Sequence, residues 1–180
     1  MPTIHFETTA LRIGDWTIVR LPESTSAKLP SRGMTLVEGT INSFGSKIVL
    51  EPDGKGSHWF RVDSRLGKAA NIVAGGKVTM AVEPSKEWPE PDVPADLNKA
   101  LTSDPQANAL WMKITPMARW DWLRWIRATN NRETRSRRIE VAFSKLKAGE
   151  RRPCCFNRNL CTEPEVSKNG VLIEPMQTTK

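Results

Sequence analysis

Tryptophans and arginines are the side chains of this sequence best suited to recognising a ligand, and they are concentrated between residues 111 and 152. From Lys113 to Arg152 the chain holds twelve basic residues and four acidic ones, a local excess of eight, whereas the whole chain carries a net charge of +7. This segment therefore accounts for the entire basic excess. A basic surface attracts anionic partners, which include nucleic acid and acidic proteins.

One expected helix in this segment begins with Thr115 as its N-cap and Pro116 at its first position. At 100° per residue its apolar residues share one broad face, whereas Trp120 lies on the opposite face with Arg124 and Arg127. An exposed indole beside guanidinium groups fits three roles that the sequence leaves open. These are a local cation–π stack, a base-stacking site for nucleic acid, and the anchor of a protein interface.

A second helix is expected after a capping box that runs from Asn130 to Glu133. Arg132 and Arg135 fall on its apolar stripe, where a buried guanidinium must be paired. We therefore predict that both are structural bridges, which bind helix ends or an acidic residue such as Asp121. The surface predicted to bind a protein partner or nucleic acid consists of Trp120, Arg124, Arg127, Arg137 and Arg138.

Three cysteines and two histidines raise the question of a metal site, but their spacing argues against one. Cys154 and Cys155 are adjacent, Cys161 follows six residues later, and His5 and His58 lie in another part of the chain. Zinc sites need four ligands and commonly use a Cys-x₂₋₄-Cys spacing. The sequence therefore predicts no metal ligand and leaves the cysteines as free thiols.

The glycine-rich turns do not form a motif for binding a phosphate or a dinucleotide. Gly54-Lys55-Gly56 and Gly75-Gly76-Lys77 are too short to cradle a phosphate, and the chain has no nucleophile elbow. We expect no catalytic residue, no cofactor and no small-molecule substrate. The sequence thus predicts a protein that is not an enzyme.

Three features of the sequence concern its compartment. No apolar run approaches the roughly 18 residues that cross a bilayer, and residues 1–7 lack the basic-then-apolar pattern of a secretory signal. An odd number of cysteines is typical of thiols kept in a reducing compartment. The sequence predicts a cytoplasmic protein without membrane insertion.

The order of composition along the chain indicates two domains. Short runs rich in Val, Ile, Thr, Phe and Trp, broken by turn residues, are typical of a barrel of short strands. Prolines and acidic residues then indicate a stiff linker, and helical periodicity follows it. We predict a β-barrel domain at 1–86, a Pro-rich linker at 87–94, a helical domain at 95–152, and an irregular, mobile tail at 153–180.

Two stretches carry a resemblance to known families. Arg124-Trp125-Ile126 followed by Glu133-Thr134-Arg135-x-Arg137-Arg138-Ile139 resembles the signature of the bacteriocin-protection, or OmpD-associated (YdeI/OmdA-like), family. Trp16-Thr17-Ile18-Val19 and Glu38-Gly39-Thr40-Ile41 resemble a domain of unknown function that is often fused to it. The resemblance implies a double-split β-barrel, related to those of AbrB-type transcription factors, followed by a small helical domain. It implies no established activity.

The fold class predicted from these observations is α+β, with an AbrB-like barrel and a small C-terminal helical domain. We expect a non-enzymatic binding or adaptor protein whose basic helices dock a protein partner, with nucleic-acid binding as the alternative. The two functions differ in whether the arginine side chains form one continuous patch or are separated by Asp121, Glu133 and Glu140.

Overall fold

The computed structural model describes residues 2–153 and 156–175, which form two compact units. The first unit contains the described residues among 2–87, 158–161 and 166–175, and the second contains those among 88–157 and 162–165. Cys154 and Cys155 lie outside the described residues, so the free thiols expected there stay a prediction.

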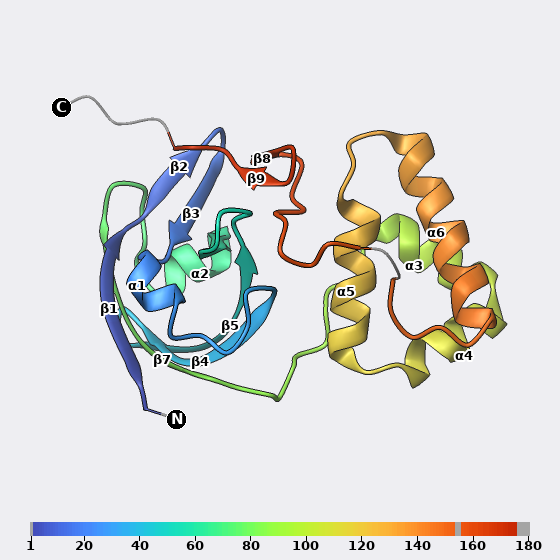
Figure 1. Cartoon of the computed structure of the whole chain (residues 1–180), viewed down its shortest axis with the longest axis horizontal. Helices are drawn as coiled ribbons and strands as arrows, with labels where there is room; N and C mark the ends of the chain where they lie inside the picture. The colour runs from blue at the N-terminus through green and yellow to red at the C-terminus, as the bar shows by residue number, and fades with distance from the viewer. Residues whose placement is uncertain (1, 154–155, 176–180) are drawn as a thin grey trace. The chain divides into compact units, whose positions relative to one another are not determined.

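A seven-stranded antiparallel sheet in the order β1-β7-β4-β5-β6-β3-β2 builds the first unit. Figure 1 shows that this sheet curls on itself, as a half-barrel does. Its strands are β1 (Ile4–Thr9), β2 (Leu11–Ile13), β3 (Trp16–Arg20), β4 (Thr35–Ile41), β5 (Phe44–Pro52), β6 (His58–Val62) and β7 (Lys77–Pro84). Two short helices, α1 (Glu23–Ser26) and α2 (Ser64–Ala69), lie between strands.

Alternation of apolar and polar residues directs one face of each strand into the core of the first unit. In β1, Ile4 and Phe6 are buried, and in β7 the alternating Val78, Met80 and Val82 are buried against them. These observations confirm the predicted α+β class with an N-terminal barrel-like sheet. The AbrB-related type of the barrel stays a prediction.

Four helices form most of the second unit, namely α3 (Ala95–Ser103), α4 (Pro105–Lys113), α5 (Pro116–Arg127) and α6 (Arg132–Lys147). Thr115 caps α5 as predicted, since its hydroxyl accepts a hydrogen bond from the Ala118 N–H at 3.2 Å. Asn131, one residue later than predicted, caps α6 by accepting from the Thr134 N–H at 2.9 Å. No helix in the described part of the chain is both long and apolar enough to cross a membrane.

The proline-rich segment before α3 is held by the second unit. The carbonyl of Pro89 accepts a hydrogen bond from Trp120 Nε1 at 2.8 Å, and Glu90 pairs with the buried Arg119. Val93 packs against the helical core. The contacts begin just past Glu87, where the first unit ends, so residues 88–94 form part of the second unit.

The tail that the sequence predicts to be irregular contains a small hairpin in the first unit. Strands β8 (Ser167–Lys168) and β9 (Val171–Leu172) pair across Asn169 and Gly170, which both have positive φ. Cys161, Val166 and Leu172 are buried in a cluster with the barrel residues Ile13, Ile18 and Trp59. The sequence did not predict this packing, because a strand-like run of two or three residues does not show which part of the chain it packs against.

The close approach of β4 to β7 at Gly39 predicts a large effect of adding one methyl group. Gly39 has φ +156°, and a Cβ there would lie 2.1 Å from the Ala81 carbonyl oxygen. We expect Gly39→Ala to lower the free energy of unfolding by about 1–3 kcal/mol or more. The new methyl group would meet the backbone of β7, which cannot shift without disturbing its pairing with β4. Gly45→Ala, whose Cβ would meet nothing within 4 Å, is the control and should stay within about 0.5 kcal/mol of the wild type. Urea denaturation measures both, and equal midpoints would contradict the packing described.

Candidate functional site

Helix α5 carries three of the predicted binding residues, and the structure does not expose them together. Arg124 is fully buried, with its guanidinium 5.5 Å from the centre of the Phe156 ring. Trp120 is half-buried, and Arg127 pairs with Glu163 at 2.8 Å. The predicted exposed face does not form, because non-helical segments cover the side of α5 that helical spacing alone would assign to solvent.

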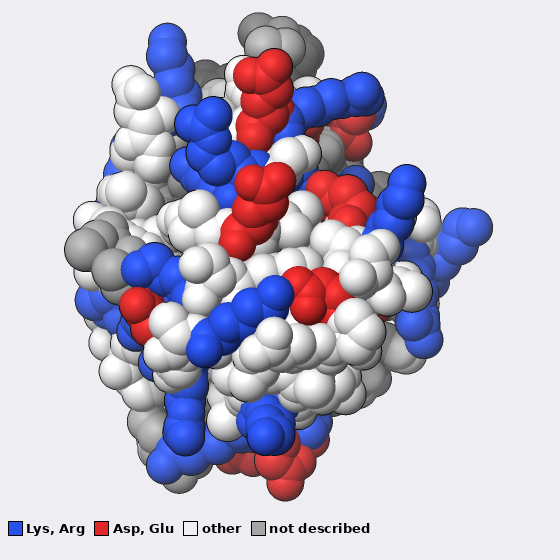
Figure 2. Space-filling view, turned by 90° about the vertical axis from the view of Figure 1, so that its right-hand side faces the viewer, with Lys and Arg blue, Asp and Glu red and all other residues white. Residues whose placement is uncertain are grey.

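The other two predicted binding residues lie on α6 and differ from each other. Arg138 donates a hydrogen bond to the Trp125 carbonyl at 2.7 Å, and its guanidinium lies 5.5 Å from the centre of the Trp125 ring. Arg137, by contrast, is exposed. Figure 2 shows that lysine and arginine side chains on the face it displays are separated by acidic and uncharged ones. With Arg124 buried, the five predicted residues do not make one continuous basic patch.

The two residues predicted to be structural bridges, Arg132 and Arg135, differ in their surroundings. Arg132 is exposed, while Arg135 forms a two-bond ion pair with Asp96 in the first turn of α3, at 2.5 Å and 3.1 Å. The hydrogen bond and charge of Arg135 hold the pKa of Asp96 below its usual value, and Asp96 in turn raises the pKa of Arg135. Asp121, the partner that the sequence suggests, instead lies 3.6 Å from Arg152 Nε.

Arg119 is a structural residue that sequence analysis counted only as one more positive charge. Its side chain is buried and donates to the carbonyls of Trp111 at 3.0 Å and Ile114 at 2.8 Å, and it pairs with Glu90. The carbonyls at a helix C-terminus lack partners within the helix. Arg119 supplies donors at the end of α4, and its spacing in the sequence gives no signal of this role.

A hollow of about 290 Å³ lies where α4 and α6 end. Leu110, Ile114 and Leu146 contribute its apolar lining, and the last two are buried residues of the helical core. The other lining residues are Lys113, Gly149, Glu150 and Arg151. No residue of this site belonged to the predicted binding surface.

The end of α6 gives the hollow its shape. Gly149 has φ +91°, the Glu150 N–H bonds the Lys145 carbonyl at 2.9 Å, and the Gly149 N–H bonds the Leu146 carbonyl at 3.0 Å. These bonds define a Schellman end, in which glycine adopts the left-handed conformation at no steric cost. The Arg151 carbonyl accepts from Trp122 Nε1 at 2.9 Å, which fixes the backbone beyond the turn.

Two cations at the rim of the hollow have no counter-charge among the described residues. Lys145 pairs with Glu150 at 3.3 Å, and Lys147 pairs with Asp104 at 2.6 Å. Lys113 and Arg151, by contrast, are exposed and make no side-chain hydrogen bond or ion pair with any described residue. The hollow therefore combines an apolar interior with two exposed positive charges that no described residue neutralises.

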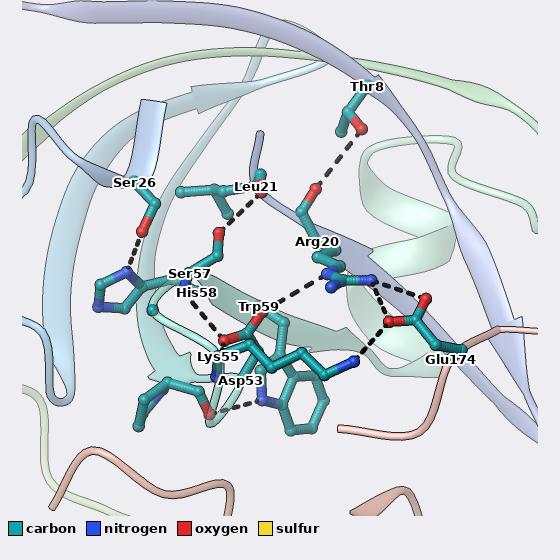
Figure 3. Close-up of polar contacts among 12 residues, drawn as sticks. Thr8, Arg20, Leu21, Ser26, Asp53, Lys55, Ser57, His58, Trp59 and Glu174 are labelled. Carbon is teal, nitrogen blue, oxygen red and sulfur yellow. Dashed lines mark hydrogen bonds and ion pairs between the residues drawn. The ribbon is translucent and has the colours of Figure 1, made fainter. Parts of the chain in front are cut away.

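A buried histidine in the first unit has the partners of a structural residue. His58 Nε2 lies 2.8 Å from the Gly33 carbonyl, to which it must donate, so Nδ1 accepts from Ser26 Oγ at 2.6 Å (Figure 3). Burial lowers the pKa of His58. Arg32 donates to the Ser26 carbonyl at 2.5 Å and to that of Leu29 at 3.1 Å. Both ring nitrogens are occupied by the protein, as expected for a histidine that supports the fold.

Potential metal ligands do not cluster in the part of the chain that the structure describes. No three His, Cys, Asp or Glu side chains among residues 2–153 and 156–175 lie together as a metal site requires. Cys161 is a buried free thiol.

A curled antiparallel sheet joined to four helices that bear an apolar hollow defines a two-part protein of α+β class. Residues 90–149 match the family model described as bacteriocin-protection, YdeI or OmpD-associated, and residues 6–82 match that of a domain of unknown function, DUF1905. Residues 6–82 are thus similar to the DUF1905 family and residues 90–149 to the bacteriocin-protection family, in agreement with the resemblance seen in the sequence. The comparison with curated proteins finds no match.

The Arg135–Asp96 pair predicts a pH-dependent contribution to stability. Because the folded-state pKa of Asp96 is lowered from its ordinary value of 3.8, the pair stabilises the fold above that pH and is lost as the pH falls through the lowered pKa. Urea midpoints should therefore differ between the wild type and Asp96→Asn at about pH 7, and the difference should shrink as the pH falls through the lowered pKa of Asp96. Arg135→Met should resemble Asp96→Asn. A wild-type advantage that persists at the acidic end would show that charge pairing is not its source.

Proposed function

We propose that this chain is a cytoplasmic, non-enzymatic protein whose second unit docks a protein partner at the hollow between the ends of α4 and α6. The observation that carries the proposal is the apolar lining flanked by Lys113 and Arg151, two exposed cations without a described counter-charge. The description of the matching family, bacteriocin protection, supports a protective role at the level of the family.

Size and lining favour the side chains of a peptide over a metabolite. Small-molecule sites usually enclose about 300–1,000 Å³, and this open hollow of about 290 Å³ lies at the lower limit. An apolar anchor that fills a pocket, with charges at its edge, is the usual centre of a protein interface. The expected ligand is therefore an apolar side chain within an acidic segment, whose carboxylates would approach Lys113 and Arg151.

The lining of the hollow also supports a binding role over a catalytic one. The titratable groups among its described lining residues are Lys113, Glu150 and Arg151, and Glu150 is paired with Lys145. Hydrolytic and transfer chemistry commonly needs a nucleophile that is hydrogen-bonded to a base. Among residues 2–153 and 156–175, no serine, cysteine or histidine lines this hollow.

Nucleic-acid binding is the alternative, in which an AbrB-related barrel and the arginines of α6 would contact phosphates. Each neutralised phosphate contributes to affinity through counterion release, so such binding benefits from many free cations along one surface. Burial of Arg124 and pairing of Arg127 reduce that number here. The docking proposal is favoured for this reason.

A pair of charge-reversal variants tests the docking proposal. The probe is a labelled acidic peptide, Glu-Glu-Leu-Leu-Glu-Glu, and its comparison peptide has serines in place of the leucines. We expect Lys113→Glu with Arg151→Glu to weaken binding of the first peptide at least about tenfold, because it reverses both rim charges. Arg132→Glu with Arg137→Glu makes the same change in net charge at other exposed positions and should alter affinity less than about twofold.

Two outcomes would contradict docking at the hollow. Equal losses in the two double variants would show that only net charge matters, and equal binding of the serine peptide would show that the apolar lining is not used. Single- and double-stranded oligonucleotides at low salt test the alternative. Oligonucleotide binding with a Kd below about 100 μM, lost in the double variant Arg137→Glu with Arg138→Glu, would favour nucleic acid as the ligand.

A further inference from the structure

The first unit holds a carboxylate of its own tail between two cations. Glu174 accepts hydrogen bonds from Lys55 Nζ at 3.0 Å and from Arg20 Nη1 at 3.2 Å (Figure 3). These bonds hold the pKa of Glu174 below its usual value, with Lys55 the larger cause. The Glu174 side chain is 61% exposed, so the carboxylate lies at the surface of this site.

The barrel positions both cations. Asp53 is buried, and its Oδ2 lies 3.5 Å from Arg20 Nε. Its Oδ1 accepts hydrogen bonds from the N–H groups of Lys55 at 2.7 Å and Ser57 at 3.0 Å, which close the turn between β5 and β6. Asp53 therefore orients the side chain of Arg20 and the backbone of Lys55 through contacts within residues 20–57. A site organised before its ligand arrives spends less free energy on ordering during binding.

The tail also contributes to a buried apolar cluster of the first unit. Leu172, two residues before Glu174, is buried in the cluster formed with Ile18 and Trp59. The Leu172 N–H donates to the Asp53 carbonyl at 2.8 Å. The backbone carbonyl of Gly170 approaches so closely that a Cβ on Gly54 would lie 2.1 Å from it. The tail thus contributes one aliphatic side chain, a backbone hydrogen bond and a carboxylate, as a bound peptide would.

The strands that hold the tail are short. Its strands β8 and β9 are two residues each, and the buried side chains that it adds to the cluster are Cys161, Val166 and Leu172. Segments with short ladders and few buried contacts open at lower free energy than the core of a domain. A competing segment could therefore displace the tail while the sheet remains folded.

We propose that residues 166–174 occupy, in cis, a peptide-docking groove of the first unit, and that a protein partner binds there through an aliphatic residue followed two positions later by a carboxylate. Leu172 and Glu174 of the tail define this pattern. Arg20 and Lys55 recognise the carboxylate, and Ile18 and Trp59 contact the aliphatic side chain. The groove is separate from the hollow of the second unit and does not depend on the function proposed for it.

The test uses the full-length chain and a labelled peptide with the sequence of residues 166–175. Leu172→Asp with Glu174→Lys removes both features of the tail, and this released variant should bind the peptide at least about tenfold more tightly than the wild type, whose groove is filled. Ile173→Asp changes an exposed neighbour and should bind like the wild type. Adding Lys55→Met to the released variant should weaken peptide binding about fivefold or more, because it removes a charged hydrogen bond to the peptide's carboxylate. Replacing the peptide's glutamate with glutamine should have a similar effect.

Thiol reactivity gives a second readout of tail opening. With Cys154→Ser and Cys155→Ser, Cys161 is the remaining cysteine, and it is buried in the same cluster as Leu172. Glu174→Gln should increase its rate of alkylation, whereas Ile173→Asp should not. A released variant that stays folded by circular dichroism but binds no peptide would overturn the proposal. Loss of the folded sheet in that variant would also overturn it, because the tail would then be part of the core.

Discussion

The buried guanidinium of Arg119 is the interaction on which the arrangement of the second unit depends. A charge withdrawn from water must be matched by acceptors, and Arg119 finds them in the end of α4 and in Glu90. The same contacts hold the proline-rich segment, since Trp120 binds Pro89 one residue away. A stretch whose composition suggests a stiff linker is therefore fixed to α5, and the indole of Trp120, which was predicted to be exposed, is half-buried.

In the first unit the buried charged group that needs partners is the carboxylate of Asp53. Its buried carboxylate joins β3, through Arg20, to the turn that precedes β6, and its own carbonyl holds the tail at Leu172. Removing one partner of such a set leaves a buried group without compensation, which costs more than the bond itself contributes. The polar groups that fix the fold here also leave two cations in position to bind a carboxylate.

The sequence predicted the features that depend on neighbours along the chain. Alternation identified the strands of the barrel, and Thr115 with Pro116 marked the start of α5 correctly. It did not predict the surroundings of Arg124 or the hairpin after Ser167, because both depend on which distant segments cover a face. Helical periodicity sorts residues around one helix, but it does not show which of two polar faces another segment will bury.

In the segment from residue 113 to 152, the choice between protein docking and nucleic-acid binding depends on which cations distant segments bury or pair. Among its cations, Arg119, Arg127, Arg135, Lys145, Lys147 and Arg152 each have a carboxylate within 4.0 Å. Arg124 is buried, and Arg138 lies against Trp125. The exposed cations of this segment for which the described residues provide no counter-charge are Arg132 and Arg137 on α6, and Lys113 and Arg151 beside the hollow. Phosphate backbones favour a continuous row of cations, whereas a pair of cations next to an apolar hollow suits a short acidic segment with an apolar anchor.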